Sequence, residues 1–316
     1  MKGLDLGRYA LCSCAAIALL AGCGGSQPPI GAAGAVQRNA NERPHDRNAT
    51  RSALLYVSDP AAHKVFMYSY PQLQLKGTIT GISTPQGLCI DPATQNVWVV
   101  TSYTQGQIIE FKHGGMHPIR DLNLGGGANI YGCAVSPKTG DLAVTSRNQG
   151  SFPGALYVFE KARGKPKSYG APGPKMYWPY FVAYDSSGNA FVDGYGGQYA
   201  LQVAELEPTA RKLHIVTPTG LGGYSPGGVQ YNDTNLAIGN AKSAVIYQIT
   251  DGEVTGKTTL EDACRVWQFF IDGNRVIAPN ACKHGGRVSI YDYPAGETPL
   301  KTLTGLKSPF AAVISR

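Results

Sequence analysis

The stretch Pro85-Gln86-Gly87-Leu88-Cys89-Ile90-Asp91, followed after a short polar segment by Val97-Trp98-Val99-Val100, has the pattern of two β-strands joined by a turn. Each apolar run is too short for a helix, is rich in aliphatic residues and is bounded by Pro, Asp or Asn, which favours strands. The stretch is therefore predicted to be a β-hairpin.

The first run of this hairpin recurs along the chain. Its copies end at small polar residues that lie 45, 49, 47, 40 and 43 positions apart: Asp91, Ser136, Asp185, Asn232, Asp272 and Ser315. Second, third and weaker fourth apolar runs follow most copies. A period in the forties with four strands per unit is typical of β-propeller blades. The sequence predicts an all-β, six-bladed β-propeller over residues 53–316, with four antiparallel strands per blade.

The two ends of this predicted domain complement each other. Ala311-Ala312-Val313-Ile314-Ser315 is an isolated first run, and Leu54-Leu55-Tyr56-Val57 is a second run without a first. Pairing them closes one blade and removes two exposed sheet edges. A two-sheet sandwich with a chance repeat is the alternative architecture.

The pattern Pro-x-Gly-apolar, ending at Asp and resuming with an apolar run, resembles NHL-type and regucalcin/gluconolactonase-like six-bladed propellers. The stretch from Pro85 to Val100 is the best copy, and Pro226-Gly227-Gly228-Val229 and Pro309-Phe310-Ala311-Ala312 are looser ones. The resemblance covers residues 53–316. It implies a fold more than an activity.

The N-terminal segment predicts export and lipid anchoring. Lys2 and Arg8 precede an apolar stretch that is too short to span a membrane, and the stretch ends in Leu20-Ala21-Gly22-Cys23, which resembles the lipobox of bacterial lipoproteins. We expect a signal peptide over 1–22, lipidation of Cys23 and a flexible tether over 23–52. An ordinary cleaved signal peptide is the alternative. The expected location is the bacterial cell envelope, with the choice of membrane left open.

Composition and charge limit the classes of protein and partner. The chain has 316 residues, 43% hydrophobic and 16% charged, which is ample for a core and excludes a disordered chain or a coiled coil. The formal charge is +7, of which residues 53–316 carry +4, with one dense basic run at Lys161, Arg163, Lys165 and Lys167. We therefore expect no nucleic-acid partner.

Loops that enter each first strand and loops that join second to third strands share one face of a propeller. That face is predicted to hold the ligand-binding residues Tyr103, Asn129, Tyr131, Arg147, Tyr177, Trp178, Asp193, Tyr195, Asn240, Trp267 and Asn280. The same loops bring Asp59, His63, Asn148, Phe152, Tyr180, Tyr199, Tyr224 and His284 to it. Aromatic rings beside oriented polar groups suit a small molecule, a glycan or a protein. Wedging of the aromatics between blades is the structural alternative for any one of them.

Catalysis is the competing hypothesis. Regucalcin-like lactonases hold a divalent cation with a Glu from a Glu-Gly-Pro opening, and the corresponding opening here is Thr84-Pro85-Gln86-Gly87. Oxygens of Asp59, Asn129, Asp193, Asn240 and Asn280 could still ligate a hard cation. The alternative function is thus a metal-dependent lactonase or related hydrolase with its site in the central cavity of that face, although no metal site or catalytic residue is assigned. Gly223-Tyr224-Ser225-Pro226-Gly227 fits a nucleophile motif only by letter, because no helix follows.

Four cysteines remain after the predicted leader and Cys23. A hairpin turn at Asp272-Gly273-Asn274-Arg275 that pairs Ile271 with Val276 places Cys264 one position from Cys282, which predicts a disulfide in an oxidising compartment. Cys89 and Cys133 lie on different first strands. We expect them to pack as small apolar groups, with their disulfide status left open.

Overall fold

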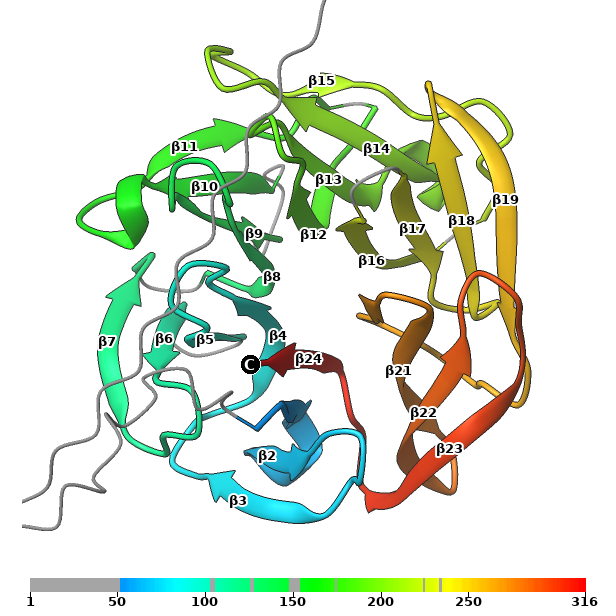
Figure 1. Ribbon diagram of the computed structural model, residues 1–316. Helices are drawn as coiled ribbons and strands as arrows, with labels where there is room; N and C mark the ends of the chain where they lie inside the picture. The colour runs from blue at the N-terminus through cyan, green and yellow to red at the C-terminus, as the bar shows by residue number, and fades with distance from the viewer. Residues whose placement is uncertain are drawn as a thin grey trace, which may run out of the picture. The chain divides into compact units, whose positions relative to one another are not determined.

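Strands form nearly all the regular structure in the computed structural model (Figure 1), which describes residues 52–102, 106–125, 128–147, 154–173, 175–223, 225–232 and 235–316. Within these ranges the remaining elements are three short 3-10 turns: η1 (Pro60–Ala62), η2 (Glu160–Ala162) and η3 (Gly197–Tyr199). The all-β class is confirmed. The predicted signal peptide, Cys23 and Tyr103 lie outside the described residues, as do Asn148, Phe152 and Tyr224.

Four of the sheets in the described part of the chain contain four antiparallel strands each. In spatial order they are β24 (Ala311–Ser315), β1 (Leu54–Asp59), β2 (Lys64–Ser69) and β3 (Leu75–Ile79); β4 (Pro85–Ile90), β5 (Val97–Thr101), β6 (Gln107–Phe111) and β7 (Pro118–Asn123); β8 (Ile130–Val135), β9 (Leu142–Ser146), β10 (Ala155–Phe159) and β11 (Lys167–Gly170); and β12 (Trp178–Tyr184), β13 (Ala190–Tyr195), β14 (Leu201–Leu206) and β15 (His214–Ile215).

A further sheet has eight strands and consists of two antiparallel halves. One half is β16 (Pro226–Tyr231), β17 (Leu236–Asn240), β18 (Val245–Thr250) and β19 (Glu253–Leu260), and the other is β20 (Phe270–Asp272), β21 (Arg275–Cys282), β22 (Gly285–Asp292) and β23 (Gly296–Leu306). Only two parallel residue pairs join β19 to β23, Thr259 with Gly296 and Leu260 with Glu297. The halves therefore differ from the other sheets only in sharing an outer edge.

The strand pairs that decided the sequence prediction are present. Ile90 pairs with Val97 across the β4–β5 hairpin. Leu54 pairs with Ser315 and Val57 with Ala312, so the last strand completes the sheet that begins at the start of the described chain. The predicted closure between the two ends is confirmed.

The first strands β4, β8, β12, β16, β20 and β24 follow one another around the centre, with the other strands further out (Figure 1). Glycine allows neighbouring first strands to approach closely. A Cβ on Gly87 would lie 2.3 Å from the carbonyl oxygen of Tyr131, and a Cβ on Gly132 would lie 2.8 Å from the Cα of Phe181. The glycine of the Pro-x-Gly pattern is thus a packing requirement of the ring centre.

The same close approach corrects the expectation for Cys89 and Cys133. They form a disulfide between β4 and β8, with Cα atoms 5.6 Å apart. The expectation was wrong because two adjacent first strands lie near enough for their cysteines to bond. The two cysteines are 44 residues apart along the chain, and this separation does not show how close they are in space.

Second strands sit between the layers of side chains from neighbouring sheets. All residues of the second strands β5 and β9 are buried. Trp98 of β5 is among the largest fully buried side chains, as are Phe111 and Phe159 of the adjacent third strands β6 and β10. Each such ring stabilises the fold by about 1.5–3 kcal/mol relative to an exposed one. The strands all belong to one compact unit, so this packing holds the ends of the first strands in fixed positions.

Candidate functional site

One face of the ring is formed by the loops that precede each first strand and by those that join second to third strands. We call it the loop face, and the opposite side the turn face. Trp178 begins β12, Tyr195 ends β13 and Tyr199 ends η3, so these three rings meet at the loop face. Their positions follow from strand direction, because every first strand runs away from this face.

Aromatic side chains on the loop face form one connected cluster with a buried base and an exposed rim. At the base, the ring centroids of Tyr131 and Tyr180 are 4.6 Å apart, and Tyr180 meets Tyr195 edge-on at 5.3 Å. Tyr195 in turn contacts Trp178 edge-on at 6.2 Å and Tyr199 at 5.8 Å. Tyr199 is 62% exposed, whereas Tyr180 is 4% exposed. The cluster therefore joins a rigid core to solvent-facing rings.

Phe310, which precedes β24, extends this cluster across the centre. Its ring lies 6.2 Å from Tyr131 and 5.9 Å from Phe181, and it stacks on Trp267 at 5.6 Å with an interplanar angle of 19°. Rings from two different sheets and from the loops before β20 and β24 thus fill the middle of the loop face.

Two arginines lie over the rings of the two tryptophans of the loop face. The guanidinium carbon of Arg147 is 4.8 Å from the ring centroid of Trp178, and that of Arg265 is 5.1 Å from the ring centroid of Trp267. Arg147 also donates a hydrogen bond of 2.8 Å to the hydroxyl of Tyr180. Contact with the indole restricts both side chains, and the hydrogen bond to Tyr180 restricts Arg147 further.

A small cavity of about 180 Å³ opens among the exposed rings. Tyr177, Trp178, Tyr195 and Tyr199 line it together with Gly196, Gly197 and Gln198. Gln198 and Tyr199 have φ values of 56° and 61°, a conformation that non-glycine residues rarely adopt. The loop thus accepts backbone strain, of about 1–3 kcal/mol per residue, in the conformation that turns the Tyr199 ring toward Trp178 and Tyr195.

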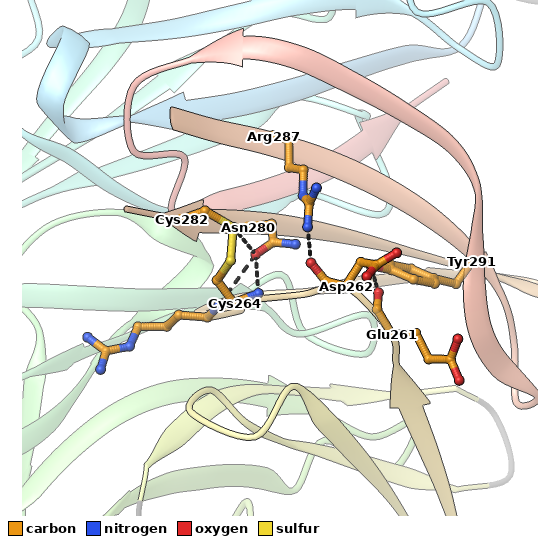
Figure 2. Close-up of a disulfide and its surroundings, with 8 residues drawn as sticks. Glu261, Asp262, Cys264, Asn280, Cys282, Arg287 and Tyr291 are labelled. Carbon is orange, nitrogen blue, oxygen red and sulfur yellow. Dashed lines mark hydrogen bonds between the residues drawn. A yellow bond between two sulfur atoms is a disulfide. The ribbon is translucent and has the colours of Figure 1, made fainter. Parts of the chain in front are cut away.

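The loop that carries Arg265 and Trp267 is tied to the edge of β21 (Figure 2). Cys264 forms the predicted disulfide with Cys282, which confirms that pairing. The side-chain oxygen of Asn280 accepts hydrogen bonds from the backbone amides of Cys264 at 2.7 Å and Arg265 at 3.4 Å. These contacts fix the backbone directly beside Arg265.

Further contacts hold the start of the same loop. The hydroxyl of Tyr291 donates a 3.0 Å hydrogen bond to the carbonyl oxygen of Glu261, and the guanidinium of Arg287 donates to the carbonyl oxygen of Asp262. These contacts fix the backbone of the loop at Glu261 and Asp262.

Comparison with known proteins identifies the fold. The chain matches no protein-family model and no curated protein. Among solved structures it is similar to a protein of unknown function from Bacteroides caccae (TM-score 0.64, 12% identity, 84% of this chain and 100% of that one) and to a chain of a nidogen/laminin complex (0.66, 13%, 84% and 98%). A third is hydrazine synthase of Kuenenia stuttgartiensis (0.53, 14%, 76% and 73%). The chain folds as a β-propeller.

The polar residues predicted for the loop face of the propeller lie beneath its surface. Asn129, Asp193, Asn240 and Asn280 are buried. The carboxylate of Asp193 accepts a 2.8 Å hydrogen bond from the amide of Phe181, and burial raises the pKa of Asp193 to about 8 although backbone amides oppose the shift. Asp193 and Asn280 therefore hold neighbouring backbone segments together through these hydrogen bonds.

The structure thus divides the predicted site into two sets. Tyr131, Arg147, Tyr177, Trp178, Tyr195 and Trp267 come together in or beside the aromatic cluster, and the polar residues support it from below. Sequence reasoning missed Arg265 and the role of Phe310. The available signal for Arg265 was its place two residues before Trp267 in the loop of the predicted disulfide.

The residues present do not fit the cation site of the regucalcin-like resemblance. Asp59 accepts hydrogen bonds from the amides of Lys307 at 2.7 Å and Ser308 at 3.0 Å. One carboxyl oxygen of Asp193 and the side-chain oxygen of Asn280 also accept hydrogen bonds from backbone amides. In the described ranges, moreover, no three His, Cys, Asp or Glu side chains form a group suited to a metal ion. We derive no metal chemistry from this propeller.

A central cavity of about 350 Å³ opens on the turn face. Its wall contains apolar residues of the first strands, including Leu88, Val182 and Val313, and Pro92, Gln95 and Arg316 lie at its turn-face end. The side-chain amide of Gln268 crosses to β4 and makes two hydrogen bonds with the backbone of Leu88, at 3.2 and 2.6 Å. On the loop face, by contrast, the centre is filled by Tyr131, Phe181 and Phe310.

Proposed function

We propose that the protein is an exported, lipid-anchored propeller that binds a protein partner through its loop face. The observation that carries this proposal is the joint placement of two tryptophan–arginine stacks and exposed tyrosines on one face. Trp, Tyr and Arg are the residues that contribute most to binding at protein interfaces. Tyr177 and Tyr199 are 41% and 62% exposed although they adjoin the buried cluster, as an unoccupied binding surface requires.

A protein is favoured over a glycan by the positions of the arginines. Sugars stack on open indole faces, and here one guanidinium group lies over the ring of Trp178 and another lies over the ring of Trp267, on which Phe310 also stacks. The exposed surface is consequently a mixture of tyrosine rings and guanidinium edges, which suits side-chain and backbone groups of a polypeptide.

The architecture and location belong to the same proposal. Counting each half of the eight-stranded sheet as one blade makes six blades, in keeping with the NHL-type resemblance, because only two residue pairs join the halves. Two disulfides are expected in an oxidising compartment such as the cell envelope. The lipobox-like segment ending at Cys23 would anchor the chain there. In the described ranges no helix is long and apolar enough to cross a membrane.

Site-specific photo-cross-linking in the producing cell tests the binding face. A photoreactive phenylalanine analogue replaces Tyr199 on the loop face or, as a matched control, Met116, which is 50% exposed in a turn of the opposite face. We expect a discrete protein adduct at position 199 that is lost when Trp178→Ala is added, and none at position 116. Equal adducts at both positions, or none at position 199, would reject the proposal.

A further inference from the structure

We propose that the loop face selects an acidic polypeptide segment, with Arg265 as its main carboxylate-binding residue. This inference rests on the proposed function, since it specifies the chemistry of the partner at the same face. It is carried by the charge distribution among the loops, by the geometry of Arg265 and by the shape of the small aromatic cavity.

Charge is divided unequally between the two faces of the propeller. In sequence, the loops of the loop face contain six Lys or Arg residues and two carboxylates outside the buried strand ends, a surplus of four positive charges. The basic residues are Arg147, Lys175, Lys242, Arg265, Lys283 and Lys307. The carboxylates are Glu261 and Asp262. Loops of the turn face carry basic and acidic residues in nearly equal numbers. The field of the loop face therefore attracts anions, whereas that of the turn face does not.

Arg265 is placed to bind a carboxylate group. Its side chain is exposed and stacked on Trp267, and among the ion pairs of the described residues none involves its guanidinium. Contact with the indole, at 5.1 Å from the guanidinium carbon to the ring centroid, restricts the side chain, and a guanidinium carries parallel N–H donors along one edge. A carboxylate can accept two parallel hydrogen bonds from such an edge. The disulfide between Cys264 and Cys282 and the Asn280 hydrogen bonds hold the preceding backbone, which reduces the entropy lost on binding.

The aromatic cavity argues for a polypeptide rather than a diffuse polyanion. The space of about 180 Å³ among Trp178, Tyr195 and Tyr199 is mostly apolar and has the dimensions of a single side chain. Arg147 stacks on Trp178, one wall of this cavity, so a positive charge adjoins an apolar pocket. A segment that alternates carboxylates with an apolar or aromatic residue matches both features. A uniformly charged polysaccharide or a lipid headgroup layer matches only the charge.

The test measures binding of defined peptides to the detergent-solubilised full chain by fluorescence anisotropy. One probe is a short peptide of glutamates around a single phenylalanine, and the matched probe replaces every glutamate with glutamine. We expect binding of the glutamate probe only, weakened by added salt. Arg265→Gln should weaken it about tenfold or more, as loss of one charge-assisted hydrogen-bonded pair does. Arg163→Gln, which removes the same charge from an exposed site on the turn face, should weaken it less than about twofold.

Several results would overturn the inference. Equal binding of both probes, or equal losses in Arg265→Gln and Arg163→Gln, would show that Arg265 does not select carboxylates. Tighter, Arg265-dependent binding of polygalacturonate or of phosphatidylglycerol vesicles would assign the face to an anionic glycan or membrane instead. Thermal unfolding of each variant confirms that it is folded, which is expected because both arginines are exposed. Adducts at position 199 in the cell together with no preference for the glutamate probe would leave the proposed function standing and reject only the acidic partner.

Discussion

The rings of Phe181 and Phe310 lie 5.9 Å apart although their strands, β12 and β24, are separated by two other first strands in either direction around the ring. Phe181 is 2% exposed and Phe310 is 6% exposed. The contact therefore spans the centre of the propeller and closes it on the side of the loop face. It also joins the aromatic cluster at β12 and β13 to the Trp267 loop.

Phe310→Ala should destabilise the protein by about 3–5 kcal/mol, because it removes a buried ring that contacts Tyr131, Phe181 and Trp267. Urea unfolding measures the change. Leu300→Ala, at a side chain that is 53% exposed, is the control and should cost no more than about 0.5 kcal/mol. Similar losses in the two variants would show that Phe310 does not connect the sheets.

Asp193 should make stability depend on pH. Its pKa is about 8 in the folded protein and about 4 in an unfolded chain, so between these values only the folded state holds the proton. The contribution of this carboxyl to the free energy of unfolding is fully present below about pH 4 and is lost as pH rises through about 8. The free energy of unfolding then falls by up to about 1.4 kcal/mol per pH unit.

Asp193→Asn imitates the protonated carboxyl and should remove this slope. The free energy of unfolding of the variant, measured in urea, should therefore improve relative to that of the wild type between about pH 5 and about pH 8. If the free energies of unfolding of the variant and the wild type differ by the same amount at both pH values, the buried carboxyl is not the source of the pH dependence of stability.

The two disulfides should differ in their effect on stability. In the chain-entropy treatment, a bond between residues 44 positions apart stabilises by about 4 kcal/mol, and one between residues 18 apart by about 3 kcal/mol. We expect Cys89→Ala with Cys133→Ala to lower the unfolding free energy more than Cys264→Ala with Cys282→Ala. Alkylation of the denatured, unreduced protein followed by mass spectrometry should find all four cysteines protected. An alkylated Cys89 would contradict the pairing of β4 with β8.

Cys23 should carry the lipid that anchors the chain. Metabolic labelling with a radioactive fatty acid in a bacterial host should label the wild type and not Cys23→Ser, which should also leave the membrane fraction. The lipid chains supply the binding energy of the anchor, at about 0.8 kcal/mol per buried methylene. Cys14→Ser serves as the control and should stay labelled. A labelled Cys23→Ser protein would place the modification elsewhere.

Local pattern was sufficient for the propeller class, for the hairpins and for one disulfide. The run from Pro85 to Asp91 carries its strand, its turn and the glycine of the close approach within seven residues, and the pairing of Ile271 with Val276 follows from a turn signal between them. Such features depend on side-chain period and on turn chemistry, which neighbouring residues determine. The regular spacing of copies then predicted the order of sheets and the pairing of the run 311–315 with the run 54–57, which the structure shows as β24 beside β1.

Tertiary structure alone decided which predicted residues meet and which reach solvent. Cys89 bonds to Cys133, and Phe310 meets Phe181, because the ring brings together strands that are distant along the chain. Asp193 is buried while Tyr199 is exposed although both were expected on one face, since burial depends on the depth of each residue below the loops. The stacking of Arg265 on Trp267 depends on the disulfide and hydrogen bonds that tie the loop carrying both residues to β21. Contacts of this kind arise from the sum of many non-local packing choices, which no single stretch of sequence encodes.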